Sequence, residues 1–208
     1  MKKIIKQGAP ESFEQWKTEF LTAHSRQPTY DDFRGGEKQN LKYHLIQEQG
    51  SICCYCMKSI GFDCHIEHFI PRSSAARDGC SLNLSYENLL ASCEGEDGDR
   101  SCCGHYKNDV DFALLLSPVE DAVEALFQYD VLGNIKGIAT SAAETIRWLN
   151  LNSFELKRHR KTAIQWSGYY DNDYDERRES LLQFYASRDS CQAFQAYCMA
   201  ILYVMNNN

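Results

Sequence analysis

Four short segments between residues 53 and 107 carry most of the metal-binding and titratable side chains that stand out in this chain. They are CCYC at 53–56, CHIEHFIPRS at 64–73, NLSYENLLASC at 83–93 and SCCGHYKND at 101–109. Cysteines lie before and after an adjacent Glu-His pair, an Asn follows the pair, and a further His follows the last cysteine. This order of side chains predicts a metal-supported core, around which the rest of the chain is organised.

The composition predicts a folded domain. With 208 residues, of which 43% are hydrophobic and 12% aromatic, the chain can bury a core as one domain, with or without a helical extension. Residues 1–12 carry positive charge without a long apolar run, and no segment approaches the roughly 20 apolar residues of a membrane span. We therefore expect a cytoplasmic protein that makes no membrane contact.

The ten cysteines indicate metal binding, because they cluster beside histidines and follow no signal peptide. Cys53 and Cys56 form a C-x-x-C pair, and Cys93 with Cys103 offers a second pair. Four such ligands complete a closed tetrahedral Zn²⁺ site, which stabilises a fold and leaves no position for a reacting water.

Each pair leaves two adjacent cysteines as alternatives for one metal ligand. Cys54 adjoins the first pair and Cys102 adjoins the second, so either could replace its neighbour as a ligand.

The net charge of −7 is unusual for a protein that grips nucleic acid alone, because phosphates are normally neutralised by a basic face. Either a partner supplies much of the contact with nucleic acid, or the basic residues form a local patch from Arg72, Arg77, Arg100 and Lys107. We favour the partner. The acidic run at 171–179 is interpreted as a solvated helix start.

Periodicity predicts an α+β fold in three regions. Region 1–50 is expected to hold two helices, one over 12–24 and one ending at Gly50. Region 51–117 is expected to hold strands over 52–57, 63–70 and 88–92 and a helix from His105 that carries Phe112, Leu115 and Leu116. Region 118–208 is expected to hold a hairpin (125–130 with 134–138), helices over 141–149 and 153–169, and one or two helices over 176–204. The last helix is expected to carry an apolar stripe, interpreted as core, of Phe194, Tyr197, Cys198, Ile201 and Leu202.

Hydrolysis of a phosphodiester needs an activated water and a cation that stabilises charge on the phosphate. His68 fits the general base, since neutral imidazole titrates near working pH. Glu67 and His105 fit a pair of ligands for Mg²⁺ or another divalent cation. Glu67 and His68 are adjacent, however, and successive strand residues point to opposite faces, so the strand must end or bulge there. His65 shares a face with Glu67 and is the alternative candidate, either as a cation ligand or as a group that supports the ligands.

Three further residues receive supporting roles. Asn88 is expected to brace the loop and to orient His68 through its side-chain amide. Lys107 or Arg72 is expected to contact a substrate phosphate.

These segments resemble the HNH endonucleases, on the strength of IEHFIPRS, the Asn of YENLLASC, and CGHYK. The resemblance implies a ββα-metal core with His68 as base, Asn88 as loop brace, His105 as metal ligand and Glu67 in the place of the usual acidic ligand. The cysteine pairs are similar to the zinc-supported branch of that family. One departure from the family is the insertion of residues 94–101 between Cys93 and Cys102, because the second cysteine pair is usually compact.

A narrower resemblance rests on HIEHF, NLLASC with a delayed CGH, and TIRWLNLN followed by LKRHR. These features are similar to the PtuB-type HNH proteins of Septu anti-phage systems, which also occur as retron effectors. The resemblance implies a PtuA-type ATPase partner and a role in antiviral defence.

Two hypotheses follow. The chain is a metal-dependent nuclease that cleaves DNA or RNA, with tRNA as one candidate, or a zinc-built module that binds nucleic acid or a partner without cleaving. The intact set Glu67, His68, Asn88 and His105 favours the nuclease.

Overall fold

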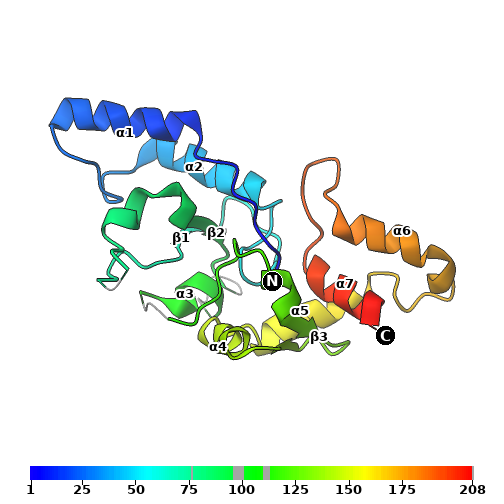
Figure 1. Ribbon diagram of the computed structural model, residues 1–208. Coiled ribbons are helices and arrows are strands. Elements are labelled where there is room, and N and C mark those ends of the chain that lie inside the picture. The colour runs from blue at the N-terminus through cyan, green and yellow to red at the C-terminus, as the bar shows by residue number, and fades with distance from the viewer. Residues whose placement is uncertain (76, 96–100, 110–112, 208) are drawn as a thin grey trace.

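The computed structural model describes residues 1–75, 77–95, 101–109 and 113–207. Helices α1 (Glu11–His24) and α2 (Gly35–Glu48) lie along one side of the small sheet of β1 (His65–His68) and β2 (Leu89–Ser92) (Figure 1). Helices α5 (Phe154–Gln165), α6 (Tyr174–Ala186) and α7 (Cys198–Asn207) gather at the other end of the molecule. The architecture is a mixture of helices and two-stranded sheets, compatible with the expected α+β class. Among the described residues, no helix is long and apolar enough to cross a membrane.

The N-terminal helices agree with the prediction. Helix α1 spans Glu11–His24 and α2 spans Gly35–Glu48. Phe13 of α1 is buried against Phe33, with ring centroids 5.1 Å apart, so aromatic packing joins α1 to the segment before α2. After α2 the chain turns at Gly50, whose φ is +65° and where an added Cβ would lie 2.5 Å from the Phe194 ring. A glycine is therefore needed at this turn.

Strands β1 (His65–His68) and β2 (Leu89–Ser92) form an antiparallel pair. In its register His65 lies opposite Ser92, and His68 lies opposite Leu89. The strand expected over 63–70 is therefore present but shorter, and the strand expected over 88–92 is confirmed.

The strand expected over 52–57 is wrong. Ile52 makes one isolated bridge to Ser59, and the chain then turns through the C-x-x-C segment, with Met57 at a φ of +65°. The turn carries the Cys54 amide to the Ala91 carbonyl at 3.1 Å, so this segment still lies beside β2. The buried Gln49 amide also bonds both the N–H and the C=O of Ala91.

The helix expected from His105 is present but much shorter than predicted. Helix α3 covers the five residues Cys103–Lys107 and is capped by Asn108, whose φ is +55°. Leu115 and Leu116 are buried outside any helix, and Phe112 lies outside the described residues. The polar loop between the strands contains two 3₁₀ turns, Ser81–Leu84 and Tyr86–Asn88.

The C-terminal region follows the predicted order. A 3₁₀ turn at Val123–Leu126 leads into the antiparallel hairpin of β3 (Phe127–Tyr129) and β4 (Ile135–Gly137). The helices that follow are α4 (Thr140–Trp148), α5 (Phe154–Gln165), α6 (Tyr174–Ala186) and α7 (Cys198–Asn207).

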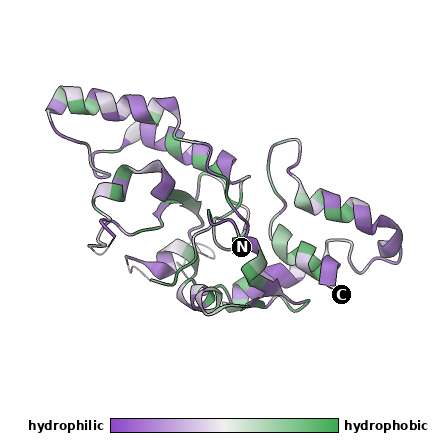
Figure 2. Cartoon of the chain, viewed as in Figure 1, coloured by the Kyte–Doolittle hydropathy of each residue, from purple (hydrophilic) through white to green (hydrophobic). Residues whose placement is uncertain are grey.

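Helix α7 is the most apolar of these C-terminal helices (Figure 2). It packs against α5, α6 and β3. Its Cys198 and Ile201 are buried, so these members of the predicted apolar stripe belong to the core. The acidic run at 171–179 contains the exposed start of α6, as expected.

Arg160 joins the hairpin turn to helix α5. Its side chain is 1% exposed, and it donates to the Gly133 and Leu151 carbonyls at 2.7 Å each. The two buried carbonyls depend on this guanidinium for a hydrogen-bond donor, because they have no access to water when it is removed.

We expect Arg160→Met to lower the free energy of unfolding by about 2–4 kcal/mol, because two buried carbonyls lose their donor while most of the side-chain volume remains. Arg158→Met, on the exposed face of the same helix, is the matched control and should change the free energy by less than about 0.5 kcal/mol. Urea unfolding followed by circular dichroism measures both values. Equal effects of the two substitutions would contradict this role for Arg160.

Candidate functional site

Four buried thiols meet where the C-x-x-C turn, the end of β2 and the start of α3 come together. Cys53, Cys56, Cys93 and Cys103 each offer a sulfur, and these atoms lie within 4.8 Å of one another. The group contains the four cysteines chosen from the sequence and neither Cys54 nor Cys102. The structure therefore brings together a four-cysteine group that could hold a structural metal ion.

The surroundings of these sulfurs suit a cation. Burial disfavours the Cys53 thiolate, but hydrogen bonds from Cys103, Cys54 and Cys56 outweigh it and hold the pKa of Cys53 well below its usual range. Backbone N–H groups also point at the sulfurs, from Lys58 to Cys56 and from Cys93 to Cys53, at 3.4 Å each. The pKa values of the other three thiols are raised, so the charged sulfur favoured in this buried site is that of Cys53, and a divalent ion bound there would neutralise it.

A polar pocket of about 210 Å³ opens beside this group, between β1, α3 and the segment around Tyr30. The predicted residues Glu67, His68 and His105 all line it, together with the rival His65. Strand β1 ends at His68, and the chain turns away towards Pro71. The end of the strand lets two adjacent side chains serve one pocket, which was the condition set by the sequence.

Glu67 is held as a buried carboxylate. Its Oε1 accepts from Lys107 Nζ at 3.0 Å and from the Tyr55 hydroxyl at 3.1 Å, and its Oε2 lies 3.4 Å from His65 Nε2. Burial disfavours the charged form, but His65 and Lys107 prevail and lower the pKa of Glu67. Glu67 is therefore ionised and firmly positioned.

Lys107 is enclosed rather than offered to solvent. Its side chain is 1% exposed, and besides Glu67 its ammonium reaches the carbonyls of His68 at 3.0 Å and Phe69 at 3.3 Å. A contact between Lys107 and a substrate phosphate stays a prediction, and it would have to compete with these three acceptors. Arg72, the other candidate, lies on the rim of the pocket and pairs with Asp31 at 2.8 Å. Arg100, named for a basic patch, lies outside the described residues.

His68 is a largely buried imidazole with one nitrogen engaged. Its Nε2 lies 2.9 Å from the Asn83 carbonyl, and its ring meets the Tyr30 ring edge-on at 4.5 Å between centroids. A carbonyl can only accept, so Nε2 carries the hydrogen and Nδ1 is free to take a proton. Burial lowers the pKa of His68 and favours the neutral ring that a base requires.

Asn88 ties the loop together. Its Oδ1 accepts from the Ile70 N–H at 2.7 Å, and its Nδ2 donates to the carbonyls of Ile70 at 2.9 Å and Leu82 at 3.3 Å. The amide thus reaches the two ends of the loop rather than the His68 ring. His68 is oriented by Asn83, in the loop that Asn88 holds.

Two residues of the site received no role from the sequence. Glu94 places its carboxylate 2.5 Å from His105 Nε2 and 3.3 Å from His65 Nδ1. Tyr55, inside the C-x-x-C turn, is the buried partner of Glu67. Their signal in the sequence was position alone, since each directly follows or lies between predicted metal-binding cysteines.

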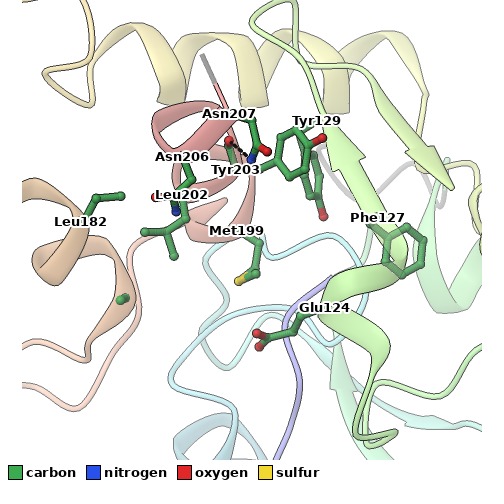
Figure 3. A pocket seen from close by; sticks show the side chains of 10 residues that line it. Glu124, Phe127, Tyr129, Leu182, Met199, Leu202, Tyr203, Asn206 and Asn207 are labelled. Carbon is green, nitrogen blue, oxygen red and sulfur yellow. Dashed lines mark hydrogen bonds between the residues drawn. The ribbon is translucent and has the colours of Figure 1, made fainter. Parts of the chain in front are cut away.

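A larger cavity of about 370 Å³ lies between α6, α7 and β3 (Figure 3). Phe127, Met199 and Leu202 line it together with the amide-bearing Asn206 and Asn207. Glu124 is the one carboxylate among the described residues around it, and they include no cysteine or histidine. Among the described residues, acid–base and metal-binding groups concentrate instead in the pocket beside β1.

Cys56→Ser should release the ion of the four-cysteine group and destabilise the fold by several kcal/mol, because binding energy of a structural metal is folding energy. Cys191→Ser changes an exposed cysteine outside the group and should retain both metal and stability. Elemental analysis of the purified variants and their thermal unfolding provide the measurements. A Cys56→Ser protein with full metal content would show that the sulfur of Cys56 is not a ligand.

No protein-family model matches the chain. Over 142 residues it is 30% identical to a Vibrio cholerae (serotype O1 biovar El Tor) protein named as the HNH endonuclease of retron Vc95, a match that covers 64% of this chain and 67% of that protein. Over 75 residues it is 32% identical to an Escherichia coli protein named as the HNH endonuclease of retron Ec83, covering 32% of this chain and 29% of that protein. At 30% identity over two thirds of the Vibrio cholerae protein, the first match is extensive enough to assign the family. This chain belongs to the HNH endonucleases.

Proposed function

We propose that the chain hydrolyses phosphodiester bonds in nucleic acid with the help of a divalent cation. The observation that carries the proposal is the common pocket of His68 and His105, which come from β1 and α3 and lie beside the four-cysteine group. A base and a cation ligand facing one polar cavity are the minimum that this reaction requires.

In this proposal β1, β2 and α3 form the ββα-metal core, within region 51–117, and the flanking regions 1–50 and 118–208 support it. A closed set of four thiolates is typical of structural Zn²⁺, so we assign zinc to the four-cysteine group. Zinc there anchors the start of α3 through Cys103, two residues before His105.

His68 acts as the general base. As the water oxygen forms its bond to phosphorus, Nδ1 of His68 takes the water proton, and the bond from phosphorus to the leaving sugar oxygen breaks. The hydrogen bond from Nε2 to Asn83 holds the ring while the imidazolium forms. Bound at His105 with the support of Glu67, a divalent cation such as Mg²⁺ would stabilise charge on the phosphate and the leaving oxygen.

The acidic charge of the chain supports a protein partner that shares the contact with nucleic acid. We propose an ATPase of the PtuA type and a function in anti-phage defence in the cytoplasm. The names of the two relatives place them in retrons, which supports a defence setting. The substrate is DNA or RNA, with tRNA included.

His68→Ala should reduce cleavage by about 10²–10⁴-fold, because the attacking water loses its base, while folding and bound metal stay unchanged. His24→Ala, an exposed histidine at the end of α1, is the control and should cleave as the wild type does. Each protein is co-expressed with its genomic ATPase neighbour, the system is triggered by phage infection, and new ends are mapped in total DNA and total RNA.

Ends that depend on His68 would support the nuclease, and the pool that contains them would identify the substrate. New ends that persist in His68→Ala would refute the assignment of the base. No new ends with the wild type, in a protein that retains its metal, would favour the binding module.

A further inference from the structure

Glu94 bridges the two histidines of the pocket. Its Oε2 lies 2.5 Å from His105 Nε2, its Oε1 lies 3.3 Å from His65 Nδ1, and the two imidazole rings lie 3.9 Å apart between centroids. One donor atom from each of the three residues falls within 4.8 Å of the others. Two ligands about 2.1 Å from one ion lie at most about 4.2 Å apart, so small side-chain rotations would place all three on one cation.

His65 carries the independent sign of a ligand. Its Nδ1 is buried and makes no hydrogen bond to the described part of the chain, despite the nearby Glu94 oxygen. Its other nitrogen, Nε2, faces the ionised Glu67 at 3.4 Å. A carboxylate on one ring nitrogen favours the tautomer with its hydrogen there, which leaves a lone pair on the other nitrogen for a metal.

The three side chains are accessible as well as close. His65, Glu94 and His105 are each only partly buried, whereas Glu67 is 7% exposed and already bonds Lys107 and Tyr55. Glu94 and the two imidazoles therefore have more freedom to rotate onto a cation than Glu67, which would act on it through His65.

We propose that His65, Glu94 and His105 bind the cation of the active pocket directly, and that Glu67 positions His65 behind them. This inference rests on the proposed nuclease function and names the ligands of its cation. Two imidazoles and one carboxylate suit Mn²⁺, Co²⁺, Ni²⁺ or Zn²⁺ better than Mg²⁺, which prefers an all-oxygen shell. The site therefore selects a transition-metal ion.

The same geometry couples this cation to the four-cysteine group. Glu94 directly follows Cys93, and His105 lies two residues after Cys103, so two of the three ligands extend from the segments that hold the thiols. An ion on the thiols fixes both segments at once. The pocket should then bind its cation only when the four-cysteine group is filled.

The test is a titration of the purified full chain, with its structural metal bound, with Mn²⁺ followed by electron paramagnetic resonance. Mn²⁺ is the probe because oxygen and imidazole ligands accept it, whereas thiolate sites select softer ions. The wild type should bind one Mn²⁺, and more tightly than it binds Mg²⁺ in competition. Glu94→Gln and His65→Ala should each weaken Mn²⁺ binding by at least about 10-fold, the effect expected even for an outer-shell partner.

Glu87→Gln is the matched control, because Glu87 is an exposed carboxylate in the loop before β2, and it should bind Mn²⁺ as the wild type does. Retained structural metal and an unchanged circular dichroism spectrum would show that each variant is folded. Unaltered Mn²⁺ affinity in Glu94→Gln, or tighter binding of Mg²⁺ than of Mn²⁺, would overturn the proposal.

Mn²⁺ binding and nucleic-acid cleavage test the metal site and the nuclease separately. Tight Mn²⁺ binding that depends on Glu94, in a protein that makes no new ends in DNA or RNA, would retain the metal site and refute the nuclease. Cleavage that depends on His68 but is unaffected by Glu94→Gln would retain the nuclease and refute this ligand set.

Discussion

The sulfur atoms of four cysteines are the constraint on which the rest of the site depends. They draw together segments up to 50 positions apart in the chain, from the turn at Cys53 to the start of α3 at Cys103. Helix α3 has five residues, far fewer than an isolated helix needs to be stable in water. Its geometry must therefore be imposed from its ends. Cys103 supplies the first anchor, and the position of His105 follows from it.

Lys107 supplies the second anchor, at the other end of α3. Its ammonium pairs with the buried Glu67 and is shielded from bulk water. Removing either partner would therefore leave an uncompensated buried charge. The same ammonium binds the His68 carbonyl, which ties the end of β1 to α3. A pair that contributes little net stability can in this way align His68, the proposed base on the strand, with His105, the proposed ligand on the helix. Rigid support of this kind is what a reaction centre requires.

Sequence patterns predicted the helices and the four-cysteine group well, because periodicity and ligand spacing are local or countable. They failed at residues 52–57, where turn geometry around the thiols, including the positive φ of Met57, replaced the strand that the apolar residues favoured. They failed in the length of α3, which ends at Lys107 and is capped by Asn108. They did not reveal that the ammonium of Lys107 is enclosed by β1 and Glu67, although its expected phosphate contact stays a prediction. Glu94 went unassigned because its partners are 29 and 11 positions away.

The charged side chains around the pocket explain why the proposed reaction would depend on a cation. Glu67 is paired with Lys107 and Arg72 with Asp31, while Asp109 also lines the pocket and the carboxylate of Glu94 lies beside the imidazoles of His65 and His105. Without a cation such a pocket repels a phosphate. In the proposed site a divalent ion on Glu94 would reverse the sign of the local charge, so phosphate and cation would bind cooperatively. On this proposal an acidic protein would attract a polyanion at one point, while the proposed partner would supply the broader electrostatic contact with nucleic acid.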